Sequence, residues 1–222
     1  MFGWLDVADF EWVGYTSGLS AGLTRALADL DDADLMAAAH AGWAAVPAQR
    51  VHEGASVLEH HMATSEGVAI LDVRLPVGLA PLRHAGDRPE VVGLRLAAVR
   101  IGLARKLLDQ ALGRGLFDAG RHGAAGGASD GSRSLTGGRP LLHHRLTLGA
   151  IADVLAELAS LRGYLEGATE RPSRAAVVAV HHRLTRLDWQ VAKLFGLQGD
   201  LADHPVRALF VAELAASTWV GS

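Results

Sequence analysis

Four long segments after residue 90 repeat their apolar residues with the period of an amphipathic α-helix. The second and the fourth begin with a proline in the first turn, where it is tolerated, and the third ends at Gly196. Short connections join the last three segments, which favours antiparallel neighbours. We therefore expect an all-α fold with a C-terminal four-helix bundle at residues 91–222. The segments are 91–112, 139–165, 173–196 and 204–220.

The N-terminal third of the chain is less regular. Residues 17–30 and 32–46 have helical patterns, and the second stretch offers Asp32 or Asp34 as its capping residue. Residues 67–76 alternate and are rich in β-branched side chains, which favours a strand, although a single strand needs partners. We expect an N-terminal helical segment at 1–66, followed at 67–90 by a linker and at most a remnant β-strand or hairpin.

Residues 113–138, between the first two long segments, are rich in glycine and serine. Such a composition is typical of a long mobile loop. The alternative is a glycine-rich loop that holds a phosphate group. That kind of loop requires a lysine and a fixed spacing of glycines, and this stretch has neither. We therefore expect a mobile loop.

Composition excludes several classes of protein and of site. The net charge of −3 gives no reason to expect a nucleic acid or an anionic membrane as a partner. The absence of cysteine excludes disulfides, thiolate metal sites and a cysteine nucleophile. No apolar stretch reaches the roughly 18 residues of a membrane span, and the first residues lack the pattern of a signal peptide. We expect a cytoplasmic protein.

The pentapeptide HHRLT occurs twice, with His143 and His144 in one copy and His181 and His182 in the other. Adjacent residues of a helix differ in direction by about 100°, so neither doublet can face a single metal ion. His144 and His181 lie beside the apolar stripes of their helices, whereas His182 points away. We interpret each doublet as one inward and one outward histidine, and we expect no metal site.

Arg100 lies within the apolar face of the first long segment. A buried guanidinium group needs a carboxylate or an anionic ligand, because an unpaired buried charge is too unfavourable. Glu213 lies on the apolar stripe of the fourth segment, and Asp188 lies at the edge of the stripe of the third. Either Arg100 or Arg162 pairs with Glu213 or Asp188 inside the bundle, or one of these groups contacts a substrate. We favour a pair between Arg100 and Glu213.

The order of these features over residues 67–222 resembles the C-terminal half of the acyl-CoA dehydrogenase family. In that family a last β-strand leads into a helix with a central glycine, as ILDVRLPVG leads to Gly102 here. A Gly-Lys-Pro-Leu segment opens the next helix, which GRPL at 138–141 resembles. An Ala-Asp pair at 152–153 and Arg162 follow. A segment of the family's N-terminal helical domain is similar to residues 42–59, through Gly42, Trp43, Pro47, Gly54 and Glu59.

The resemblance implies that the family's β-barrel middle domain, which contacts much of the flavin, is missing from this chain. The family's catalytic glutamate lies in a C-terminal Glu-Gly-Thr, and this chain instead ends in Trp219, Val220, Gly221 and Ser222. Removal of a hydride from an acyl chain needs a flavin acceptor and a base. We therefore expect no cofactor and no dehydrogenase reaction.

These implications lead to two hypotheses about function. The first is a flavin-independent, repurposed enzyme of bacterial secondary metabolism that binds an extended apolar, polyketide-like substrate and steers a non-redox cyclisation or rearrangement. The second is a non-catalytic subunit of a heteromeric FAD-dependent acyl-CoA dehydrogenase. Because members of the family assemble through this bundle, we expect a homo-oligomer or a full-length dehydrogenase partner.

The candidate catalytic residues are His144, His181, Asp188 and Glu213, and the candidate substrate-binding residues are Arg100, Tyr164, Trp189 and Trp219.

Overall fold

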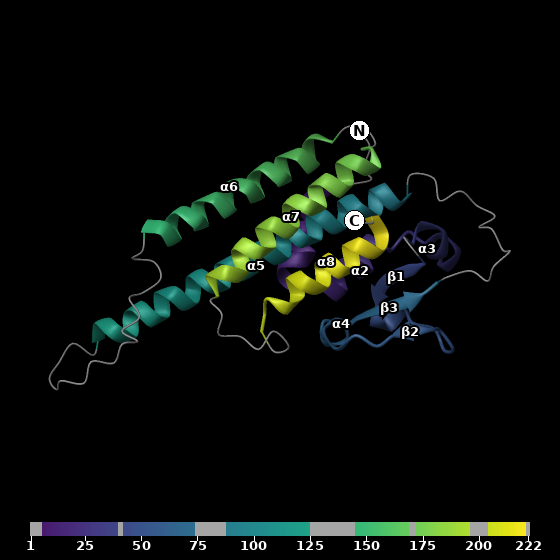
Figure 1. Ribbon diagram of the computed structural model, residues 1–222, viewed down its shortest axis with the longest axis horizontal. Coiled ribbons are helices and arrows are strands. Elements are labelled where there is room, and N and C mark those ends of the chain that lie inside the picture. Colours follow the sequence, from purple (N-terminus) through teal and green to yellow (C-terminus); the bar gives the residue numbers. More distant parts are fainter. Residues whose placement is uncertain are drawn as a thin grey trace.

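The computed structural model describes residues 6–39, 42–73, 88–124, 145–168, 172–195 and 204–220. They form a mainly helical protein with one small sheet (Figure 1). The helices are α1 (Val7–Ser17), α2 (Leu19–Ala26), α3 (Asp32–Ala38), α4 (His61–Ser65), α5 (Arg88–Ala124), α6 (Arg145–Gly167), α7 (Arg174–Leu194) and α8 (Arg207–Val220). The strands are β1 (Trp43–Pro47), β2 (Val57–Leu58) and β3 (Val68–Asp72), and a 3-10 turn spans Ala48–Arg50.

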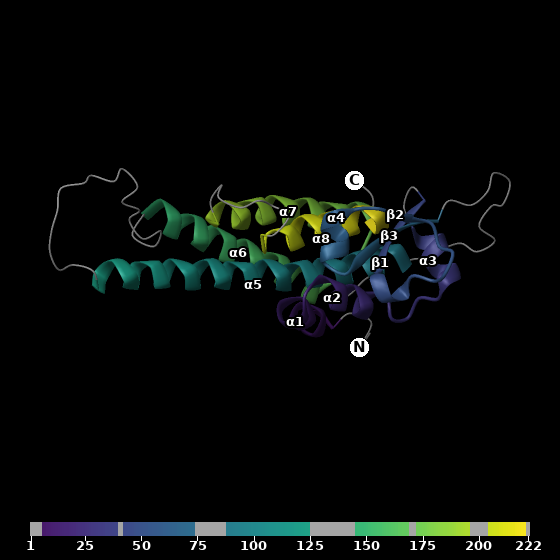
Figure 2. The same ribbon diagram turned by 90° about the horizontal axis from the view of Figure 1, so that it is seen from below.

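Helix α5 is the central element of the fold. It lies between α1 and α2 on one side and α7 and α8 on the other, and α6 packs beside it (Figure 2). Between residues 92 and 104 every side chain of α5 except Arg95 is buried, so the helix is enclosed on all faces. An enclosed helix needs apolar residues all round, which explains why this stretch is more than an amphipathic stripe.

Two glycines allow α1 and α5 to cross with their backbones in close contact. A Cβ atom added at Gly102 would lie 2.1 Å from the carbonyl oxygen of Glu11, and one added at Gly14 would lie 2.3 Å from that of Val99. Any larger residue would therefore push the two helices apart. The close approach brings Glu11 on α1 to the flank of α5.

The sheet is antiparallel with the strand order β1-β3-β2, and β1 is an edge strand. The last turn of α8 packs on it. Ala45 donates its backbone N–H to Oγ1 of Thr218 over 3.0 Å, and its carbonyl oxygen accepts from Nε1 of Trp219 over 3.0 Å. These two bonds occupy backbone groups that an edge strand otherwise leaves unpaired. They tie the N-terminal sheet to the end of α8.

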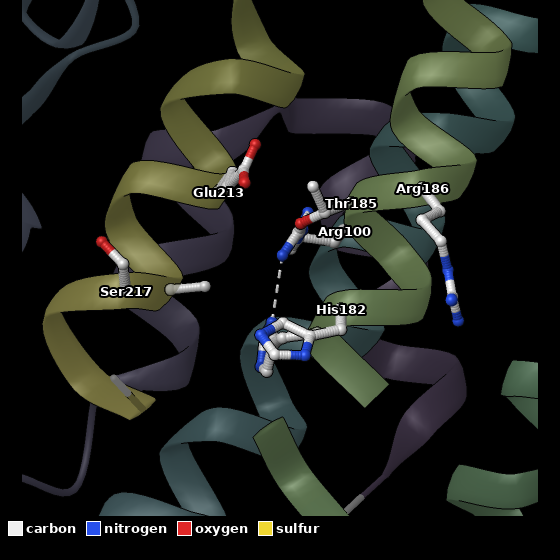
Figure 3. Close-up of a pocket in the computed structure, with 8 residues that line it drawn as sticks. Arg100, His182, Thr185, Arg186, Glu213 and Ser217 are labelled. Carbon is white, nitrogen blue, oxygen red and sulfur yellow. Dashed lines mark hydrogen bonds between the residues drawn. The ribbon is translucent and has the colours of Figure 1, made fainter. Parts of the chain in front are cut away.

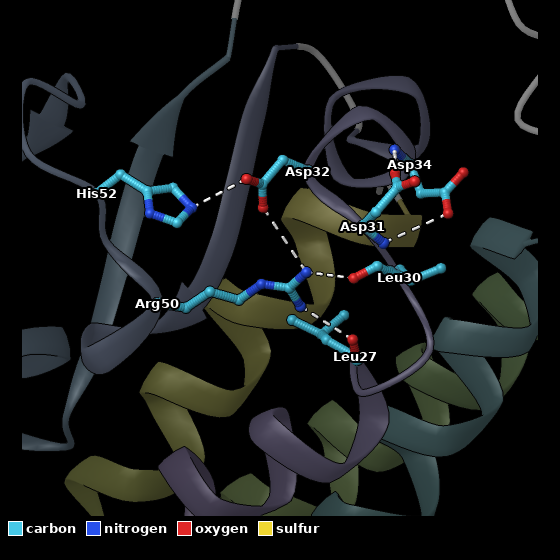
Figure 4. Close-up of polar contacts among 7 residues, drawn as sticks. All are labelled: Leu27, Leu30, Asp31, Asp32, Asp34, Arg50 and His52. Carbon is cyan, nitrogen blue, oxygen red and sulfur yellow. Dashed lines mark hydrogen bonds and ion pairs between the residues drawn. The ribbon is translucent and has the colours of Figure 1, made fainter.

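Arg50 closes the turn that follows α2 (Figure 4). Its guanidinium group donates to the carbonyl oxygens of Leu27, over 2.9 Å, and of Leu30. It also lies 3.8 Å from Asp32, whose other carboxylate oxygen contacts His52 over 2.9 Å. Carbonyl groups at the end of a helix lack intrahelical partners, so Arg50 satisfies them and holds the start of α3 against α2.

The prediction of a mainly helical chain is confirmed, and the four long helical segments are present with shifted ends. The predicted helix 32–46 is wrong in its second half, because α3 ends at Ala38 and Trp43–Pro47 is a strand. Gly42, with φ of 80°, turns the chain before that strand. The expectation of at most a strand or hairpin is corrected as well, since three strands form the sheet.

The predicted loop 113–138 is also corrected at its start. Helix α5 continues to Ala124, because the apolar residues at 112, 116 and 119 keep a helical spacing despite the glycines between them. A glycine inside a helix costs only about 1 kcal/mol, which a long helix tolerates. Residues 125–138 lie outside the described residues. In the described ranges no helix is both long and apolar enough to span a membrane.

Candidate functional site

Arg100, on the enclosed part of α5, is the largest polar side chain in the core, and it is only 1% exposed. Its Nη2 donates to Oδ2 of Asp188 over 2.6 Å and to Oγ1 of Thr185 over 3.1 Å. Its Nη1 lies 3.1 Å from Nδ1 of His181. All three partners lie on α7 at a spacing of three to four residues, so they share one face of that helix. We call these four residues the Arg100 cluster.

His181 acts in this cluster as a neutral acceptor. Its Nε2 lies 2.9 Å from the carbonyl oxygen of Gly93, which can only accept, so Nε2 carries the proton and Nδ1 accepts from Arg100. Burial and the neighbouring charge of Arg100 lower the pKa of His181 to about 3. A histidine with this pKa stays uncharged at neutral pH. Its two hydrogen bonds connect the guanidinium group of Arg100 to the backbone of α5 at Gly93.

Asp188 is the counter-ion of Arg100. Burial raises its pKa to about 6, against the lowering effect of the Arg100 charge and hydrogen bond, and Glu213 raises it further. The effect of burial on the pKa of Asp188 is therefore larger than the opposite effect of the Arg100 guanidinium group only 2.6 Å away. Oδ1 of Asp188 and Nε of Arg100 have no hydrogen-bond partner among the described residues. The pair is ionised at neutral pH, and its burial carries an unfavourable desolvation free energy.

A cavity of about 380 Å³ opens above this cluster, between α7 and α8 (Figure 3). Arg100 forms part of its floor, His182 and Thr185 line it from α7, and Glu213 faces them from α8. The volume lies within the usual range of small-molecule sites. Every lining residue except one alanine is polar. The lining residues are Arg100, His181, His182, Thr185, Arg186, Glu213, Ala216 and Ser217.

Glu213 is the one carboxylate among the residues that line the cavity. It is partly exposed, and none of the described residues offers its carboxylate a hydrogen bond or an ion pair. In Figure 3 it reaches from α8 toward the gap above Arg100, whereas Ser217 on the same helix turns away. The hydroxyl of Ser217 donates to the carbonyl oxygen of Leu214 over 2.7 Å. The cavity thus places an unpaired carboxylate opposite a fixed guanidinium group.

The structure brings together four of the eight candidate site residues, which are Arg100, His181, Asp188 and Glu213. The favoured pair of Arg100 with Glu213 is wrong, because Asp188 one helix away occupies the guanidinium group. Of the other pairings left open, that of Arg100 with Asp188 is confirmed, whereas Arg162 pairs with Glu166 and Glu11. His144 lies outside the described residues.

The remaining candidates are spread over three helices. Trp189 is half exposed on α7, one turn beyond Thr185, and its ring packs edge-on against Phe210 at 5.1 Å. Tyr164 is exposed on α6, away from this cavity. Trp219 is a core residue bonded to strand β1, which explains its burial without a ligand.

Sequence reasoning missed Thr185 and His182 as lining residues. Thr185 follows His181 by four residues and precedes Asp188 by three, so the face that carries both candidates also carries it. His182 was interpreted as pointing away from the apolar stripe, and it does, since it is exposed at the cavity. An outward side chain can still line a site when the neighbouring helix leaves a gap.

Comparison of the chain with protein-family models and with curated proteins finds no match. Within the described part of the chain, no group of three or more histidine, aspartate or glutamate side chains is arranged to hold a metal ion.

Proposed function

We propose that this protein binds a small molecule in the cavity between α7 and α8 and isomerises or cyclises it by non-redox, acid–base chemistry, with Glu213 as the general base. The observation that carries the proposal is the unpaired carboxylate of Glu213 opposite the guanidinium group of Arg100. A base and a fixed cation on two sides of a small cavity suit a reaction in which a proton leaves carbon and negative charge develops on oxygen.

The proposed reaction begins at a carbon next to a carbonyl group. Glu213 takes the proton from that carbon, and the electron pair of the C–H bond moves to the carbonyl oxygen as an enolate. The second hydrogen of Arg100 Nη1, which no described residue accepts, donates to this oxygen. In an isomerisation of a substrate with a β,γ double bond, the enolate extends over that bond as a dienolate, and protonated Glu213 returns the proton at the γ-carbon. In a cyclisation, the enolate carbon attacks a second carbonyl of the same molecule, and that oxygen receives the proton.

The Arg100 cluster prepares the guanidinium group for this role. Asp188, Thr185 and His181 hold it from one side, so its position does not depend on the ligand. A donor fixed before the substrate binds needs no reorganisation when charge develops. His181 and Asp188 are in this view positioning residues, and Glu213 is the group that contacts the substrate.

The substrate that fits is a polar head with an apolar tail. The polar groups that reach the cavity, among them Arg100 and Glu213, suit a carbonyl-bearing head group. Trp189 and Phe210 lie one helical turn beyond Thr185 and Glu213, and their rings pack edge-on against each other outside the cavity lining. An extended, polyketide-like acyl chain would lie on these rings, in keeping with the resemblance to acyl-CoA dehydrogenases.

Proton exchange at carbon tests this proposal without knowledge of the natural substrate. The protein is incubated in D₂O with the octanoyl and 3-oxooctanoyl thioesters of N-acetylcysteamine, and deuterium at the carbon next to the carbonyl is followed by NMR. We expect exchange above the protein-free rate, with a loss of about 10²–10⁴-fold in Glu213→Gln. Glu157→Gln, which changes a carboxylate on α6 paired with Arg183, is the matched control. Exchange that survives in Glu213→Gln, or no exchange with the wild type, contradicts the proposal.

A second candidate function, the non-catalytic subunit, is favoured by one surface. Helix α6 exposes Leu148 and Leu155, seven residues apart on one face, with Ala152 and Ala159 between and beside them. An exposed apolar stripe of this kind is typical of an interface. Size exclusion of the chain co-expressed with a full-length acyl-CoA dehydrogenase tests it, and elution of the two proteins in separate peaks speaks against a subunit role.

A further inference from the structure

A second cavity, of about 350 Å³, is lined by residues of α1, α5 and α6. Helix α1 lies on the opposite side of α5 from α7 and α8, which hold the proposed reaction site (Figure 2). Glu11, Trp12 and Tyr15 line it from α1, Arg105 from α5 and Arg162 from α6. This cavity shares no residue with the one that holds Glu213. Ligand binding in this cavity is therefore independent of the proposed reaction at Glu213.

Glu11 lines this cavity with a buried carboxylate, one oxygen of which accepts no hydrogen bond from the described residues. Its side chain is only 8% exposed, and Oε1 accepts from Nη1 of Arg105 over 3.1 Å. Oε2 has no hydrogen-bond partner among the described residues, although it forms an ion pair with Nε of Arg162 at 3.4 Å. A buried carboxylate oxygen without a donor is unfavourable by itself. It is therefore the natural partner of an N–H group on a ligand.

Two guanidinium groups stand beside this carboxylate with unused donors. Arg162 donates through Nε to Glu166 over 2.8 Å, which leaves both of its Nη atoms without a partner in the described part of the chain. Arg105 uses only Nη1. Both side chains are about half exposed, so these donors are open to a ligand. Two guanidinium groups at one cavity are typical of a site for a carboxylate.

An exposed aromatic surface completes the cavity. Trp12 is 64% exposed, and its ring stacks on that of Tyr15 with 6.2 Å between the ring centroids and 20° between the ring planes. The hydroxyl of Tyr15 donates to Asp109 over 2.9 Å, and this hydrogen bond and the charge of Asp109 raise the pKa of Tyr15. Tyr15 is thus held neutral as a support for Trp12. An indole ring at the edge of a cavity offers an apolar face to a ligand.

We propose that this cavity binds a free α-amino acid with an apolar or aromatic side chain. Its ammonium group donates to Oε2 of Glu11, its carboxylate accepts from Arg105 and Arg162, and its side chain packs on Trp12. A simple anion would leave the Glu11 oxygen unpaired and would be repelled by it. A simple cation would face two arginines. Only a ligand with a donor and an anionic acceptor a few bonds apart satisfies both halves of the site.

The experiment compares three probes on the intact chain: L-phenylalanine, L-phenylalaninamide, which lacks the carboxylate, and 3-phenylpropionate, which lacks the ammonium group. Binding is followed at millimolar concentration by calorimetry and by the indole N–H signal of Trp12, assigned from Trp12→Phe. We expect L-phenylalanine to bind at least about tenfold more tightly than either analogue, since each lacks one charged hydrogen-bonding group.

Three variants assign the two ends of the ligand. Glu11→Gln should remove the advantage of L-phenylalanine over 3-phenylpropionate, and Arg105→Gln or Arg162→Gln its advantage over L-phenylalaninamide. Arg183→Gln, an arginine on α7 outside the cavity, is the matched control and should bind like the wild type.

Two results on the wild type alone overturn the proposal, so it can be refuted even if a variant fails to fold. One is no shift of the Trp12 signal with L-phenylalanine. The other is 3-phenylpropionate binding as tightly as L-phenylalanine, which would make this a plain anion site.

Discussion

Replacement of Arg100 by methionine isolates the energy of the buried cluster. Methionine fills much of the same volume but removes every donor, so Asp188 keeps its charge in the core without a partner. Removing one partner of a buried ion pair typically costs about 3–5 kcal/mol, a large part of the roughly 5–15 kcal/mol that stabilises most domains. We expect a loss in this range for Arg100→Met, measured by urea unfolding at pH 8.

The double variant Arg100→Met/Asp188→Leu identifies the partner. It removes the stranded carboxylate, so most of the lost stability should return, because a buried ion pair can often be replaced by apolar side chains of similar volume. Arg100→Met/Glu213→Gln should recover at most about 1 kcal/mol, since Glu213 acts on Asp188 only through its charge. Equal recovery in the two double variants would refute the assignment of Asp188 as the partner.

The pH dependence of the same loss provides a second check. Without Arg100 the pKa of Asp188 should rise above the value of about 6 that it has in the wild type, because the only lowering influence is gone. A raised pKa in the folded state means that stability is present at low pH and is lost as the pH rises. The difference between wild type and Arg100→Met should therefore shrink from pH 8 to pH 5, by at most about 1.4 kcal/mol per pH unit. A difference that is the same at both values would refute the reasoning.

Two further predictions follow from His181 and from the glycines. The lowered pKa of His181 means that stability is present above pH 6.5 and is lost as the pH falls toward 3, by up to about 5 kcal/mol. In His181→Gln this loss should be absent, so urea midpoints at pH 7, 5 and 4 should fall less steeply than in the wild type, and parallel profiles would contradict it. Gly102→Ala should cost about 1–3 kcal/mol or more, because the added Cβ meets the backbone of α1. Gly149→Ala, in open space on α6, should instead stabilise by about 0.5–1 kcal/mol, and thermal unfolding of the two variants separates these cases.

The sequence by itself determined the long helices. Each is built from hydrogen bonds between residues four apart, so the period of its apolar residues and a nearby proline or glycine are enough to locate it. The same local logic identified Arg100 as a buried charge that needs a partner, and it placed His181, Asp188 and Glu213 on inward faces. The prediction of a loop at 113–138 was wrong at its start, because glycine weakens a helix without ending it.

Tertiary structure alone decided which elements and charges meet. Residues 43–46 continue a helical pattern in the sequence, but Trp43–Pro47 becomes a strand because β3 and the end of α8 lie beside it. In the sequence, Asp188 and Glu213 were both possible counter-ions of Arg100. The packing of α7 against α5 brings Asp188 to the guanidinium group and leaves Glu213 unpaired at the cavity. Strand pairing and ion pairing join residues far apart in the chain, so their partners depend on helix packing that no local pattern encodes.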